Sequence, residues 1–212
     1  MDGTVTTVII LIFVFSILGG VTGKKEKVTR PTVPVVSEPY DTGQTYSQVD
    51  IANIPSPFFA AGISSNLAEK LKRFIISYAP KVEAWEAESI SENVIRYGQK
   101  YDVNPKLVAA LIARESRYNR FAISSSGAQG LGQLLPSTAS GLGISDPFDI
   151  EQNVMGTTRY VKSLLDRFSG PQQVTFSLAG YLEGPNAVKQ RGSFKEASKR
   201  YIEDIYKIYN RI

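Results

Sequence analysis

Glu115 ends an apolar stripe in the stretch KLVAALIARESRYN, residues 106–119. If this stretch is helical, Leu107, Leu111 and Glu115 fall at positions i, i+4 and i+8 on one face of the helix. A carboxyl group held against apolar neighbours has its charged form disfavoured, so its pKa rises and it stays protonated near neutral pH. Such an acid can donate its proton to a leaving-group oxygen. The alternative is a fraying helix end that leaves the Glu115 side chain in solvent.

The residue types that the chain lacks exclude several classes of catalytic and metal site. It contains no His and no Cys, which excludes His-based triads, Cys nucleophiles, thiolate zinc sites and disulfides. A reaction would therefore rely on Asp, Glu, Ser, Tyr, Lys or Arg, and we expect neither a metal nor a cofactor.

A glycine-rich loop and an aromatic side chain follow Glu115. Gly127, Gly130 and Gly132 allow a backbone that comes close to a ligand, and Gln133 then offers an amide that can both donate and accept. Tyr181 lies in a turn bounded by Gly and Pro. An acid, a polar amide and an aromatic ring suit a groove that binds a sugar polymer and cleaves it.

These motifs resemble the lytic transglycosylases of the soluble type, which have a lysozyme-like fold and are related to the goose-type lysozymes. The resemblance covers about residues 90–212, and five motifs occur in the same order as in the family. The matching positions are Glu115-Ser116, Gly127-Ala128, Gly130-Leu131, Gln133-Leu134, Pro136, Thr138-Ala139, Asp146, Pro147, Asn153, Gly156, Tyr160, Ala179, Tyr181, Gly184, Pro185 and Tyr201.

The resemblance implies that Glu115 is the sole acid and base of the reaction. It would protonate the oxygen between N-acetylmuramic acid and N-acetylglucosamine. It would then help the muramic C6 hydroxyl attack the anomeric carbon, which yields a 1,6-anhydro product. The residues implied to bind the substrate are Ser124, Gln133, Tyr181, Gly127 and Gly130, and those implied to support the site are Ser116 and Asn153.

Three positions depart from the family pattern. Gly132 replaces the usual Met and Leu182 the usual Asn, so an apolar contact and an amide are missing from the expected groove. Glu183 replaces a small residue: it is either a second carboxylate that activates water, as in a hydrolytic lysozyme of the same fold, or an exposed loop acid. A non-catalytic module that binds peptidoglycan and serves in an assembly is the alternative from another class.

The pattern of the chain predicts helices to position these residues. Asn104-Pro105 is a typical helix start, with Asn as cap and Pro at the first helical position. Another helix should begin at residues 135–137, and apolar side chains recur at helical spacing over residues 153–168 and 197–212. Strand-like alternation is scarce, so we predict a predominantly all-α, lysozyme-like domain.

The first sixty residues have a different character. Residues 1–23 contain an uncharged apolar run that predicts a single transmembrane helix or signal-anchor, with a cleaved signal and a buried core helix as alternatives. Residues 24–60 are rich in Pro, Ser and Thr, which predicts a flexible linker. We expect a helical extension over residues 61–88 and the transglycosylase domain over residues 89–212. Lys24 and Lys25 follow the apolar run and argue against simple export with the domain outside.

The charge and composition of the chain indicate which molecules it can bind. The net charge is +4 with a pI near 9.2, which suits either weak attraction to an anionic polymer or an ordinary solvated surface. The sequence has no zinc-finger spacing and no aromatic–basic RNA signature, so we expect no nucleic acid. The expected partners are peptidoglycan glycan strands, a membrane, and a secretion or conjugation apparatus or a phage virion. The expected place is the periplasmic face of the bacterial envelope, or the virion.

Overall fold

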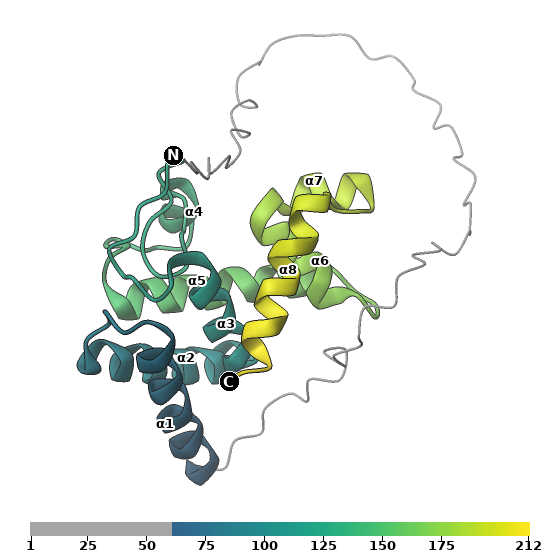
Figure 1. Cartoon of the computed structure of the whole chain (residues 1–212). Helices are drawn as coiled ribbons and strands as arrows, with labels where there is room; N and C mark the ends of the chain where they lie inside the picture. The colour runs from purple at the N-terminus through teal and green to yellow at the C-terminus, as the bar shows by residue number, and fades with distance from the viewer. Residues whose placement is uncertain (1–60) are drawn as a thin grey trace, which may run out of the picture. The chain divides into compact units, whose positions relative to one another are not determined.

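Helices make up nearly all the regular structure of residues 61–212, the part of the chain that the computed structural model describes (Figure 1). The predominantly helical fold class is therefore confirmed. No helix in this range is long and apolar enough to cross a membrane, and the expected membrane helix and linker lie outside it. The helices are α1 (Ala61–Tyr78), α2 (Ala84–Tyr101), α3 (Pro105–Ser116), α4 (Pro136–Gly141), α5 (Ile150–Arg167), α6 (Gln173–Glu183), α7 (Pro185–Arg191) and α8 (Glu196–Tyr209).

The helix that carries Glu115, α3, is the centre of the hydrophobic core. It starts where the sequence predicts: Pro105 is its first residue, and the Asn104 side chain accepts a hydrogen bond from the Lys106 amide at 2.9 Å. The helix ends at Ser116, and Arg117 and Tyr118 follow it with φ of 52° and 62°, left-handed values that are rare for non-glycine residues. Side chains on all sides of α3 are buried, and they are Leu107, Val108, Ala109, Ala110, Leu111, Ile112 and Ala113.

α1, α2 and α5 to α8 pack against α3 or against one another and complete the core. α8 and α2 pack against α3, while α1 and α5 pack against α2. α6 connects the two sides of the domain, since it contacts α5, α7 and α8 (Figure 1). The boundary expected between residues 88 and 89 falls inside α2, so the extension and the domain share one helix.

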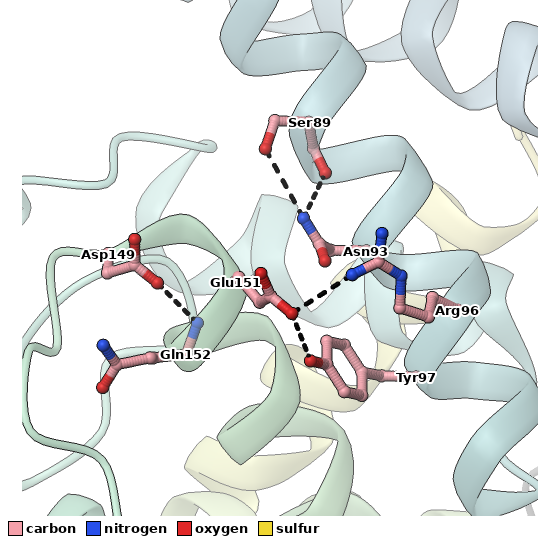
Figure 2. Close-up of polar contacts among 7 residues, drawn as sticks. All are labelled: Ser89, Asn93, Arg96, Tyr97, Asp149, Glu151 and Gln152. Atoms are coloured by element: carbon pink, nitrogen blue, oxygen red, sulfur yellow. Dashed lines mark hydrogen bonds and ion pairs between the residues drawn. The ribbon is translucent and has the colours of Figure 1, made fainter.

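Polar contacts fix the start of α5 against α2 (Figure 2). Glu151 accepts hydrogen bonds from the Tyr97 hydroxyl at 2.7 Å and from the Arg96 guanidinium at 3.1 Å. Asp149 caps α5 by accepting from the Gln152 amide at 2.8 Å, which explains why the helix begins three residues before the expected 153. The first turns of α5 are thereby held in place, and they face the glycine-rich loop.

Candidate active site

Glu115 lies in the last turn of α3, where its half-buried side chain meets α8. The Tyr201 hydroxyl on α8 donates a hydrogen bond to Glu115 Oε1. The preceding residue, Arg114, forms an ion pair with Asp204 at 3.2 Å and places its guanidinium 5.3 Å from the centroid of the Tyr201 ring. Packing of α3 on α8 therefore sets both the neighbours and the orientation of the carboxyl group.

The surroundings of Glu115 keep it protonated near neutral pH. Burial raises the pKa of its carboxyl from 4.5 to about 7, and this outweighs the hydrogen bond from Tyr201 and the charge of Arg114, which both lower it. At pH 7 a large share of the molecules thus carry a neutral Glu115 that can donate a proton. The direction of this shift is the one that the sequence predicts.

Two tyrosines converge on Glu115 from α6 and α8. Burial raises the pKa of both Tyr181 and Tyr201 well above 10, and the nearby charge of Glu115 raises it further. Both hydroxyls therefore stay protonated and act as donors. Tyr181 donates to the Gly132 carbonyl at 2.7 Å, and its ring lies 5.0 Å from that of Tyr160. This bond ties α6 to the glycine-rich loop beside the acid.

Asn153, buried at the start of α5, holds that loop. Its side chain accepts from the Gly132 amide at 2.8 Å and donates to the carbonyls of Pro147 at 2.7 Å and Gln129 at 3.2 Å. Gly130 has φ of 75°, and a Cβ there would lie 2.2 Å from Asn153 Nδ2. The position admits only glycine because the backbone is left-handed and the Asn153 side chain fills the adjoining space.

Gly132 has a packing reason of its own. A Cβ at this position would lie 1.9 Å from Thr157 Oγ1, so the Thr157 side chain occupies the space into which a larger residue would extend. The family's Met would make an apolar contact at this position; here the buried side chain of Thr157 from α5 fills the space beside Gly132. Leu182, the second departure from the family pattern, is 44% exposed at the end of α6.

The remaining expected site residues mostly brace the loop. Ser124 Oγ accepts from the Ala128 amide at 3.0 Å and bonds Ser126 Oγ at 2.8 Å. Gly127 has φ of 80°. Gln133 Nε2 donates to the carbonyls of Ala122 and Gly130, both at 3.0 Å, and the Gln133 amide oxygen takes part in neither bond.

Ser116 ends α3 by donating to the Ile112 carbonyl at 3.3 Å, one turn earlier. Its hydroxyl is therefore engaged within its own helix, next to the acid. In the part of the chain that the structure describes, no three carboxylates come together in a way that could hold a metal ion.

Glu183 requires a correction, because its interpretation as an exposed loop acid is wrong. It is only 8% exposed, so it is not a loop acid in solvent. Its carboxylate accepts from Ser198 Oγ at 2.5 Å, from the Lys195 amide at 2.7 Å and from Arg191 at 2.8 Å. Burial alone would raise its pKa, but these three donors outweigh it and lower the pKa. A carboxylate so fully bonded has little capacity left to activate water.

Sequence reasoning missed two residues that the structure brings to the site. Tyr201 matches the closing helix of the family, yet nothing in its local sequence indicates a bond to an acid 86 residues earlier. Thr157 lies at helical spacing from Asn153, and only the packing of α5 on the loop reveals its contact with Gly132. An amphipathic pattern predicts which side of α8 is buried, but not which buried hydroxyl meets Glu115.

Comparisons with known proteins identify the family of the chain. Residues 92–203 match the family model described as the transglycosylase SLT domain. A transglycosylase of Enterobacteria phage PRD1 is 32% identical over 106 residues, which cover 50% of this chain and 39% of that protein. A membrane-bound lytic murein transglycosylase F of Vibrio cholerae is 36% identical over 90 residues, which cover 41% of this chain and 17% of that protein. The chain thus spans well under half the length of these relatives.

One solved structure is similar to this chain in fold. An inactive Glu-to-Gln mutant of the lytic transglycosylase Slt from Pseudomonas aeruginosa is similar at a TM-score of 0.51 and 18% identity, covering 72% of this chain and 30% of that one. At this identity the likeness concerns the fold, and it agrees with the mainly helical, lysozyme-like domain expected from the sequence.

Proposed function

Because the chain belongs to the family of the transglycosylase SLT domain, we propose that it is a peptidoglycan lytic transglycosylase. It cleaves the β-1,4 bond between N-acetylmuramic acid and N-acetylglucosamine and leaves a 1,6-anhydro ring. The observation that carries this proposal is the half-buried Glu115, whose pKa of about 7 suits an acid that later acts as a base.

The reaction needs only one carboxyl group. Glu115 gives its proton to the glycosidic oxygen as the bond from that oxygen to the anomeric carbon breaks. The carboxylate then takes the proton of the muramic C6 hydroxyl while the C6 oxygen bonds to the anomeric carbon. No water is consumed, and Glu115 ends protonated as it began. The engagement of Glu183 by three donors supports this scheme over a two-carboxylate hydrolase.

The neighbours of Glu115 have distinct proposed roles. Tyr201 orients the carboxyl group and stabilises its ionised form once the proton has left. Tyr181 presents a ring beside the acid and holds the loop through Gly132. The free oxygen of the Gln133 amide and the loop around Ser124, Gly127 and Gly130 are proposed to contact the sugar, while Ser116 and Asn153 support the acid and the loop.

The test is to digest purified peptidoglycan with the full chain in mild detergent and to weigh the released muropeptides. Products one water lighter than hydrolysis products, without reducing ends, are expected. Products with reducing ends would show that the protein is a hydrolytic lysozyme and not a transglycosylase. Binding without release would favour the non-catalytic module.

We place this activity at the cell envelope or in a virion, supported by the membrane-bound and phage relatives. Residues 1–23 are proposed as an uncleaved membrane anchor and residues 24–60 as its linker to the domain. Extraction of the full-length chain at uncleaved mass only with detergent is the expected result, whereas a shorter chain in the aqueous fraction would indicate a removed signal. The tether suits local wall opening by a secretion apparatus or a phage.

A further inference from the structure

A pocket of about 340 Å³ lies between α1, α3 and α8. Arg114, which lines it, places its guanidinium 5.3 Å from the centroid of the Tyr201 ring, and the Tyr201 hydroxyl donates to Glu115. The pocket wall includes one aromatic ring, one carboxylate and four cations. These residues are Tyr78, Arg114, Arg117, Asp204, Lys207 and Arg211.

The charges around this pocket are not balanced. Asp204, its one acid, pairs with Arg114 at 3.2 Å. Within residues 61–212, no carboxylate forms an ion pair with Arg117, Lys207 or Arg211. Three cations therefore face one concave space whose one carboxylate, that of Asp204, is paired with Arg114. Their mutual repulsion would be relieved by an anionic ligand.

The ring of Tyr78 holds two of these cations in place. The Arg117 guanidinium lies 5.4 Å from the ring centroid and that of Arg211 lies 5.7 Å from it. Phe74 stacks on Tyr78 from the preceding turn of α1, with ring centroids 5.4 Å apart. Guanidinium groups fixed on an aromatic ring lose little freedom when they bind, and their planar fork matches a carboxylate.

We propose that this pocket binds a carboxylate of the peptide stems that peptidoglycan carries. The inference rests on the proposed function, because it concerns the same substrate. N-acetylglucosamine carries no charge, and the muramic lactyl group is amidated where a stem is attached, so the anionic groups of a stem-bearing strand lie on the peptides. Arg114 lines the pocket and packs on Tyr201, whose hydroxyl bonds Glu115, so the pocket adjoins the surroundings of the catalytic acid. A strand bound at Glu115 would therefore present its stems near Arg117 and Arg211.

The test compares two soluble substrates, uncross-linked glycan strands with their stems and the same strands stripped of stems by an amidase. The variant Arg117→Gln/Arg211→Gln removes two pocket charges without touching Arg114, which acts on the pKa of Glu115. Its KM for stem-bearing strands should rise about tenfold, because two charge-assisted contacts are lost. Its kcat, and its KM for stripped strands, should equal those of the wild type.

Two further variants separate charge from structure. Arg73→Gln/Lys189→Gln removes two exposed cations outside the pocket and should leave KM unchanged for both substrates. Arg117→Lys/Arg211→Lys keeps the charge and should recover part of the lost affinity. If the Gln variant unfolds at a lower temperature, the single change Arg211→Gln provides the same comparison, with a smaller rise in KM.

Other outcomes would overturn the inference. Equal KM values for wild type and the Gln variant on stem-bearing strands would exclude stem binding here, and cleavage of stripped strands by the wild type would leave the proposed function intact. Absence of cleavage on both substrates would contradict the proposed function itself. A defect seen only on walls that carry a phosphate polymer, and lost when the polymer is removed, would assign the pocket to phosphate instead of carboxylate.

Discussion

Glu115 and Glu183 are the same residue type at the same place in a helix, yet their surroundings have opposite effects. Each lies in the last turn, Glu115 in α3 and Glu183 in α6, where the helix dipole disfavours a negative charge. Glu115 receives one hydrogen bond, from Tyr201, and its pKa rises to about 7. Glu183 receives bonds from Ser198, the Lys195 amide and Arg191, and its pKa falls.

The two acids differ in the number of donors that bond them. Both carboxyl groups are withdrawn from water, which alone would raise the pKa of each. Three donors stabilise the ionised form of the buried Glu183, whereas the single neutral donor to Glu115 does not offset the effect of burial on its pKa. The same side chain thus becomes a proton donor at one site and a structural anion at the other.

The largest expected effect is the loss of activity in Glu115→Gln. The amide keeps the shape of the acid but has no proton to transfer, so turnover of purified peptidoglycan should fall about 10²–10⁴-fold. The fold should be retained, as measured by circular dichroism and thermal unfolding. Release of muropeptides at the wild-type rate would remove Glu115 from the mechanism.

Glu183→Ala should have its main effect on stability. The change leaves Arg191, Ser198 and the Lys195 amide without their acceptor, and the loss of a buried charge partner is strongly destabilising. The side chain of Arg191 is 37% exposed and can regain water, so we expect a decrease of about 2–4 kcal/mol in the free energy of unfolding. Urea unfolding measures it.

Asp166→Ala is the matched control for this loss. Its side chain is 59% exposed and pairs with Lys162 within α5, so the change should stay within about 0.5 kcal/mol. If both Ala variants unfold at the wild-type urea concentration, the three bonds to Glu183 contribute nothing to stability, and the contrast with Glu115 fails.

The contrast also explains what the sequence could predict. The position of Glu115 follows from the apolar spacing of α3 and from the Asn104-Pro105 start, both of which are local patterns that the structure confirms. The partners of Glu183 lie 8, 12 and 15 residues further along the chain. They meet the carboxylate only because α7 folds back and α8 packs on α6, and no local pattern specifies that turn.

The glycine-rich loop shows the same limit. Three glycines in six residues predict a backbone close to a ligand, but the bonds that shape the loop come from Asn153 and Tyr181 on two later helices. Thr157 fills the space beside Gly132. Side chains expected to face the substrate, such as Gln133, turn out to brace the loop with their donors. Long-range packing decides which polar groups remain for a ligand.

The two acids should give stability opposite dependences on pH. The folded-state pKa of Glu115 is above its unfolded value, so stability falls by about 2–3 kcal/mol as pH rises from about 4.5 through 7, where the buried group must ionise. The folded-state pKa of Glu183 is lowered, so its contribution is present above the unfolded value and lost as pH falls through the folded one.

Unfolding in urea at a series of pH values measures both dependences. Glu115→Gln should flatten the curve between pH 4.5 and 7, and Glu183→Gln should flatten it only on the acid side. An unchanged slope above pH 4.5 in Glu115→Gln would mean that the carboxyl is not protonated in the folded state at those pH values.

The smallest effect, and the sharpest test of the contrast, is expected for Tyr201→Phe. The variant removes the single donor to Glu115 and keeps the ring that packs against Arg114. Activity should fall about tenfold, since a hydrogen bond to a charged group is lost. Because that bond lowers the pKa of Glu115, its removal raises the pKa, and the alkaline limb of the pH–rate profile should move to higher pH. Arg114→Gln should move the same limb in the same direction by a smaller amount, because the Arg114 charge contributes less. A merely structural role for Tyr201 would lower the rate at every pH and leave the limb where it is.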